Sequence, residues 1–94
     1  MCQDSRAHIT VKGIVQGIGY RWFVQKAGLS LNLAGWVRNL PDGSVETEAQ
    51  GTKTAIESFL DTLRTGHSWA RVDEINTEWL EPVKKGFSGF EIKF

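Results

Sequence analysis

Apolar and polar residues alternate in the first ordered segment of the chain, residues 8–12, and this period of two predicts a β-strand. Further strands are expected over residues 34–40, 45–50 and 71–80. Phe90, Ile92 and Phe94 alternate again and predict a last strand. Val72 is out of phase with the other apolar residues of its segment, which indicates a β-bulge.

Two other segments carry apolar residues at helical spacing. The first helix, expected over residues 21–31, would bury Phe23, Val24, Ala27 and Leu31. The second, expected over residues 53–64, would bury Ala55, Ile56, Phe59, Leu60 and Leu63. Asn32 is expected to end the first helix in a left-handed conformation. Thr52 or Thr54 is expected to cap the start of the second.

The order of these elements is βαββαβ with one additional strand at the end. It predicts an α+β sandwich in which two helices pack on one face of a mostly antiparallel sheet, and the ferredoxin-like fold is the topology that fits. We expect a single domain over residues 1–94, with residues 1–6 frayed. Because successive elements reverse direction, the loop after the first strand and Asn39, at the end of the second, meet at one edge of the sheet. By the same count the last strand brings the Phe94 carboxylate toward that edge.

Composition narrows the classes of function. The apolar fraction of 40% and the charged fraction of 23% are typical of a soluble globular protein. The net charge is zero and the charges are scattered, which argues against a nucleic-acid partner. No apolar run approaches the roughly 18 residues needed to span a membrane, and residues 1–6 hold no apolar core of a secretory signal. A cytoplasmic monomer is therefore expected.

The sequence does not indicate a metal site or a catalytic thiol. Cys2 is the only cysteine, and together with His8 and His67 it makes no metal-ligand cluster. Each histidine is expected to be structural or solvated, because neither is placed to reach the glycine-rich loop described next. No metal and no other cofactor is expected.

The candidate site begins in the segment Gly13-Ile14-Val15-Gln16-Gly17-Ile18-Gly19-Tyr20-Arg21, between the first strand and the first helix. Backbone N–H groups in a glycine-rich loop at a helix N-terminus favour an anion. The groups expected to surround a phosphate are those of Gln16, Gly17, Ile18, Gly19, Tyr20 and Arg21. The Arg21 guanidinium adds two parallel donors. The alternative is an ordinary connection whose glycines only supply positive φ. The segment has neither P-loop nor dinucleotide-loop spacing.

A second segment runs from Gly35-Trp36-Val37-Arg38-Asn39 through the turn Pro41-Asp42-Gly43 to Ser44-Val45. The two segments together resemble the acylphosphatase pattern G-x-V-Q-G-V-x-[FY]-R followed by G-W-V-[RK]-N-x-x-D-G-[ST]-V, with Ile18 in place of valine. The resemblance extends through residues 87–92. It implies hydrolysis of the carboxyl–phosphate bond of a small acyl phosphate to a carboxylate and inorganic phosphate. It also implies that Arg21 binds the phosphate and Asn39 orients the water.

The residues at the site are consistent with that chemistry. An amide such as that of Asn39 can orient a water molecule but cannot take its proton. An acyl phosphate has a good leaving group, so it does not require a strong base, and the phosphate can accept the proton. Ser44 has no histidine placed to activate it as a nucleophile.

Two other functions remain open at this stage. The chain could be a non-catalytic binding module, because the ferredoxin-like fold hosts many functions. It could also be the acylphosphatase-like part of a carbamoyl-phosphate-processing protein, which would continue into zinc-binding cysteines. If the 94 residues are the full gene product, the free-standing enzyme is favoured. Residues 66–70 depart from the proline-rich connection usual in the family, so the conformation of that loop is not predicted.

Overall fold

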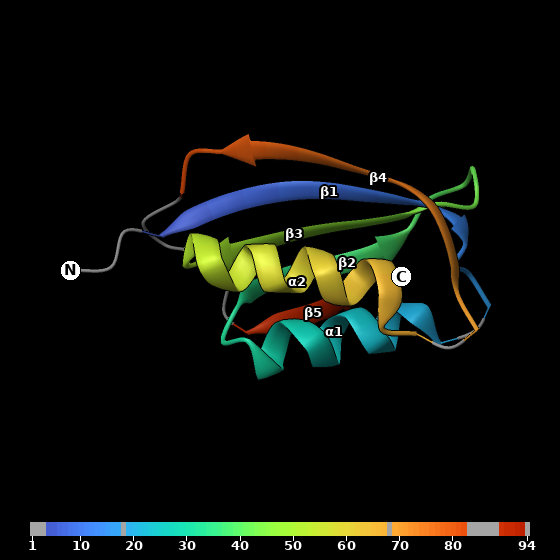
Figure 1. Cartoon of the computed structure of the whole chain (residues 1–94), viewed down its shortest axis with the longest axis horizontal. Helices are drawn as coiled ribbons and strands as arrows, with labels where there is room; N and C mark the ends of the chain where they lie inside the picture. Colours follow the sequence, from blue (N-terminus) through green and yellow to red (C-terminus); the bar gives the residue numbers. More distant parts are fainter. Residues whose placement is uncertain (1–3, 18, 68, 83–88, 94) are drawn as a thin grey trace.

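The structure is a computed structural model that describes residues 4–17, 19–67, 69–82 and 89–93. Its elements follow the expected order (Figure 1): β1 (Ser5–Ile14), α1 (Tyr20–Ser30), β2 (Ala34–Asn39), β3 (Val45–Gly51), α2 (Lys53–Thr65), β4 (Arg71–Leu80) and β5 (Phe90–Lys93). Phe94 and residues 1–3, for which the sequence made predictions, lie outside the described residues.

The five strands form one sheet in the order β4-β1-β3-β2-β5. Every neighbouring pair is antiparallel except β2 and β5, which are parallel. Both helices cover the same face of this sheet (Figure 1). The expected ferredoxin-like sandwich with an additional C-terminal strand is therefore confirmed.

The direction of the strands decides where the candidate site forms. Both β1 and β2 pair antiparallel with β3, so they run parallel to each other. The arrowheads of β1 and β2 point to the same edge in Figure 1, and β5 runs parallel to β2. The loop after β1 and the ends of β2 and β5 therefore meet at this edge, as the element count predicted.

The core lies between the sheet and the helices. Strand residues with no exposed surface include Ile9, Val11, Val37 and Val45, and the helices contribute Val24, Ile56 and Phe59. Phe23 and Leu31 are only partly buried, and Tyr20, at 1% exposure, takes part in the core. Gly28 is explained by close packing, since a Cβ at this position would lie 2.5 Å from the ring of Phe90. A glycine inside a helix is thus retained because the β5 aromatic ring needs its space.

The local expectations were confirmed with one exception. Asn32 has φ 58°, and the Thr52 hydroxyl accepts a hydrogen bond from the backbone N–H of Ala55 at 3.1 Å. The pairing of β1 with β4 shifts register after Lys12, which is the expected bulge near Val72. The prediction that residues 5 and 6 are frayed was wrong, because β1 begins at Ser5 and its second residue pairs with both neighbouring strands.

Candidate phosphate site

The loop between β1 and α1 has a backbone that only glycine adopts easily. Gly17 and Gly19 have φ of 78° and 75°, in the left-handed region. A Cβ added at either position would meet nothing within 4 Å. These glycines are therefore needed for the shape of the loop rather than for close packing, and the space beside them is open.

The loop leads directly into the N-terminus of α1. Gly19 is the N-cap residue, so no side chain caps the first turn, and that turn contains no acidic residue. The first N–H groups of a helix have no partner within the helix and carry partial positive charge. This end of α1 therefore favours an anion.

A pocket of about 280 Å³ lies at this helix end. It is lined by Val15, Gly17, Gly19, Tyr20, Arg21, Trp22, Asn39 and Ile92. The structure thus brings together the loop glycines, Arg21 and Asn39, which the sequence placed in two separate segments. Ile18 lies outside the described residues, and Gln16 does not line the pocket.

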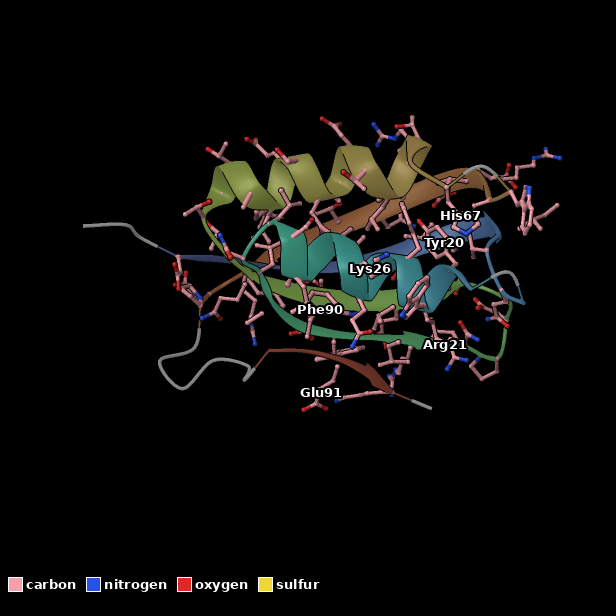
Figure 2. The ribbon with its side chains drawn as sticks, turned by 90° about the horizontal axis from the view of Figure 1, so that it is seen from below. Tyr20, Arg21, Lys26, His67, Phe90 and Glu91 are labelled. Carbon is pink, nitrogen blue, oxygen red and sulfur yellow. The ribbon has the colours of Figure 1, made fainter. Side chains whose placement is uncertain are left out.

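Arg21 extends from the first turn of α1 toward the end of β5. Its Nη1 donates to the carbonyl oxygen of Lys93 at 3.2 Å. Figure 2 shows Arg21 at the same end of α1 as Tyr20. The guanidinium is therefore held at the edge of the sheet beside this pocket, which we call the phosphate pocket after its expected ligand.

Asn39 is the last residue of β2 and lies on the same face of the strand as Val37, which is fully buried. Its Oδ1 is buried and accepts no hydrogen bond from any residue that the structure describes. Buried amide oxygens nearly always have a donor. In a pocket that can hold water, this oxygen is a ready acceptor for a water O–H.

Gln16 contributes through its side chain, which sequence analysis missed. Its Nε2 donates to the carbonyl oxygens of Leu40 and Ser44, both at 2.8 Å. The N–H of Leu40 in turn donates to the Ser44 carbonyl at 2.8 Å. Only the position of Gln16 directly before the glycines of the loop could have suggested this bracing role. The amide joins the loop to the hairpin turn that follows Asn39.

The turn itself is held by Asp42. Its Oδ1 accepts hydrogen bonds from the backbone N–H and the hydroxyl of Ser44. These bonds lower the pKa of the Asp42 carboxyl below its ordinary value. Ser44 is 3% exposed, and its hydroxyl is engaged with a carboxylate at the turn. This arrangement is that of an Asx turn rather than of an activated nucleophile.

Tyr20, which lines the pocket, joins the two helices beside it. Its phenol donates to the carbonyl oxygen of Leu63 at 2.7 Å, and burial raises the phenol's pKa. Leu63 lies in the last turn of α2, where carbonyl groups lose their helical partners. The bond therefore joins the first turn of α1 to the last turn of α2. The sequence analysis predicted only a backbone role for Tyr20, although an aromatic residue directly before Arg21 was a signal for a packing role.

The histidines lie outside the phosphate pocket. His8 Nε2 is 2.6 Å from Glu46 Oε2, and Arg38 Nε also donates to this carboxylate. Burial acts to raise the pKa of Glu46, but the hydrogen bonds from His8 and Arg38 lower it more. The Arg38 side chain, which is 50% exposed, is therefore a surface charge. The His67 ring packs edge-on against Phe23, with centroids 5.2 Å apart.

Neither a metal site nor a membrane-spanning helix is found in the described part of the chain. Within residues 4–17, 19–67, 69–82 and 89–93, no group of three or more His, Cys, Asp or Glu residues is arranged to hold a metal ion. No helix within the same ranges is both long enough and apolar enough to cross a membrane.

The chain is similar to known proteins over nearly its whole length. The acylphosphatase family model matches residues 7–92. An acylphosphatase from Moorella thermoacetica is 44% identical over 88 residues, which are 94% of this chain and 92% of the relative. The crystal structure of acylphosphatase from Bacillus subtilis superimposes with a TM-score of 0.90 at 34% identity, covering 96% of this chain and 99% of that chain.

A larger protein contains a similar unit. Full-length HypF superimposes with a TM-score of 0.86 at 30% identity, but the match is to only 12% of its chain. The relatives that match over nearly their whole length are acylphosphatases, so neither alternative function is favoured. From its motifs, fold and relatives, this chain belongs to the acylphosphatase family.

Proposed function

We propose that the chain hydrolyses the carboxyl–phosphate bond of small acyl phosphates without a metal ion, using Arg21 and Asn39. The observation that carries this proposal is the 280 Å³ pocket lined by the loop glycines, Arg21 and Asn39, whose amide oxygen is buried and has no hydrogen-bond partner among the described residues. One part of the pocket suits a phosphate group, and the other suits a water molecule.

The phosphate group would lie at the N-terminus of α1. The backbone N–H groups from Gln16 to Arg21 would donate to its oxygens, and the Arg21 guanidinium would donate to two of them side by side. Support comes from the left-handed glycines, which leave the loop open, and from a first helical turn without acidic residues. Phosphoryl transfer requires mainly such positioning and charge stabilisation.

The water molecule would donate a hydrogen bond to Asn39 Oδ1, with its oxygen directed at phosphorus. The water oxygen bonds to phosphorus while the bond between phosphorus and the carboxyl oxygen breaks. The electron pair of that bond leaves on the carboxylate, and a water proton passes to a phosphate oxygen. The products are a carboxylate and dihydrogen phosphate, so atoms and charges balance. The Asn39 amide can orient this water without a general base, because the carboxylate is a good leaving group.

Metal-independent hydrolysis is tested with a generic acyl phosphate. Purified protein is given benzoyl phosphate in buffer with excess chelator, and release of inorganic phosphate is followed. We expect full activity in chelator and competitive inhibition by added phosphate. Activity that disappears in chelator and returns with Mg²⁺ would contradict the proposal.

The remaining expectations are also proposals. We propose a single domain because of the chain's size, and no nucleic-acid partner because its charges are scattered and balanced. A cytoplasmic monomer without a membrane partner is also proposed, because the sequence holds no long apolar run. Light scattering tests the monomer directly, and an elution mass of two chains would contradict it.

A further inference from the structure

A second pocket begins where the phosphate pocket ends. It has a volume of about 490 Å³ and lies between α1 and α2. It is lined by Gly19, Trp22, Phe23, Lys26, Ala27, Ser30, Thr62 and His67. Gly19 and Trp22 line both pockets, so the two pockets adjoin at the N-terminus of α1. We call the second pocket the interhelical groove.

The interhelical groove is largely apolar. Phe23 and Ala27 pack against the core beneath it, and the Trp22 ring, with Trp22 60% exposed, stands beside it. Lys26 Nζ lies 4.5 Å from the centroid of that ring. Figure 2 shows His67 at the same end of α1 as Tyr20 and Arg21, with Lys26 farther along the helix. The groove therefore offers an apolar surface and one cation next to the phosphate site.

The direction of attack places the leaving group on the groove side. In phosphoryl transfer the attacking and leaving oxygens lie roughly in line through phosphorus. Asn39 would hold the water on the sheet side, since it shares a strand face with Val37. Trp22 lies about 200° around α1 from the buried Tyr20, on the side away from the sheet. A leaving oxygen opposite Asn39 therefore points toward Gly19 and Trp22.

We propose that the interhelical groove binds the acyl group of the substrate and gives the enzyme a preference for aromatic or branched apolar acyl phosphates. This inference rests on the proposed function, because it requires the phosphate of the same molecule in the loop. An apolar acyl group gains from leaving water. An aromatic one gains further, because the Lys26 ammonium attracts the face of an aromatic ring.

The test fills the groove from α2 without touching the phosphate pocket. Thr62→Trp places a large ring at a groove residue, and Thr65→Trp is the matched control on the same helix. Each threonine donates its hydroxyl to the carbonyl four residues earlier, at 3.0 Å for Thr62 and 3.1 Å for Thr65. Of these two threonines, Thr62 lines the groove and Thr65 does not. Values of kcat/KM are measured for benzoyl phosphate and acetyl phosphate with each protein.

The difference in intrinsic reactivity of the two substrates cancels when the ratio of their kcat/KM values is compared between the variants and the wild type. We expect Thr62→Trp to lower the benzoyl-to-acetyl ratio about 10-fold, as loss of apolar contacts in a binding pocket commonly does. Thr65→Trp should leave the ratio at the wild-type value. A wild-type ratio in Thr62→Trp overturns the groove proposal while hydrolysis itself continues. Wild-type protein that hydrolyses neither substrate instead overturns the proposed function.

A binding measurement on the unchanged protein does not depend on how the variants fold. Amide and indole NMR shifts are recorded with inorganic phosphate and with benzoylphosphonate, which is not hydrolysed. Phosphate should move signals of the loop from Gln16 to Arg21. Benzoylphosphonate should also move those of Ala27, Thr62 and the Trp22 indole. If both ligands move only the loop signals, the acyl group lies outside the groove.

Discussion

The side-chain amide of Gln16 donates a hydrogen bond to the carbonyl oxygen of Leu40 at 2.8 Å. The same nitrogen donates to the carbonyl of Ser44. Because Leu40 directly follows Asn39, these bonds fix the loop relative to the residue proposed to hold the water. The distance between the anion and its attacking water therefore depends on a side chain that contacts neither in the proposed mechanism.

Gln16→Ala should lower kcat/KM by about 10-fold and weaken phosphate inhibition, because the loop loses its brace to the hairpin. The matched control is Gln25→Ala. Gln25 Nε2 donates to the carbonyl of Phe90, also at 2.8 Å, and does not line the phosphate pocket. Both variants should lose about 1 kcal/mol of stability in urea denaturation. Equal losses of activity in the two variants would contradict the bracing role of Gln16.

Arg21→Lys keeps the positive charge but loses the planar pair of donors. We expect a fall in kcat of about 100-fold or more and a higher Ki for inorganic phosphate, with the fold retained in circular dichroism. Steady-state kinetics with benzoyl phosphate and phosphate measure both quantities. Kinetics close to wild type would mean that the phosphate binds elsewhere.

Tyr20→Phe removes the hydrogen bond between α1 and α2 and keeps the ring in the core. The Leu63 carbonyl would lose the partner that it has in the structure. A buried carbonyl without a donor costs about 1–3 kcal/mol, so the free energy of unfolding should fall by that amount. Urea denaturation measures the loss. A change below about 0.5 kcal/mol would show that water replaces the phenol.

The Glu46 carboxylate should contribute stability in a pH-dependent way. Its pKa is lowered in the folded state by His8 and Arg38, despite its burial. Its contribution is therefore present above the unfolded carboxyl pKa and is lost as pH falls through the folded value. Glu46→Gln should be less stable than wild type by about 1 kcal/mol at pH 7, and the difference should shrink below about pH 4.5.

The control for the size of this loss at pH 7 is Glu48→Gln, on the same strand. Glu48 Oε1 lies 3.6 Å from Arg6 Nη1, which is too long for a hydrogen bond, so this ion pair contributes less than the hydrogen-bonded pairs of Glu46. At pH 7, Glu48→Gln should therefore lower the free energy of unfolding less than Glu46→Gln does. A difference for Glu46→Gln that stays constant from pH 7 to pH 3 would contradict the lowered pKa.

The sequence predicted those features that depend on neighbouring residues. The spacing of apolar residues, every second residue in strands and at helical intervals in helices, predicted the order of elements. The position of Val72, out of phase with the other apolar residues of its strand, predicted the bulge. Counting strand directions brought Asn39 to the loop after β1, which the pocket confirms. The strand start at Ser5 was missed because backbone pairing with β3 and β4 extends β1 beyond its alternating apolar residues.

The contacts that complete the site could not be predicted in the same way. Gln16 and Leu40 are 24 residues apart, and Tyr20 and Leu63 are 43 apart. Such pairs form only when the hairpin and the second helix have packed against the loop. A glutamine before a glycine has many partners available in an unfolded chain, and only the packed structure selects two carbonyl groups of one turn.

The separate roles of the loop and of Asn39 are tested most directly by Asn39→Ala. This change removes the proposed water acceptor and leaves the Arg21 guanidinium and the backbone amides in place. We expect kcat to fall by about 100-fold or more, while the Ki for inorganic phosphate stays within about three-fold of wild type. Asn76→Ala, an exposed asparagine on β4, should change neither quantity. With the circular dichroism spectrum unchanged, a collapse of phosphate binding together with kcat would contradict the account, because Asn39 would then be shaping the anion site rather than orienting the water.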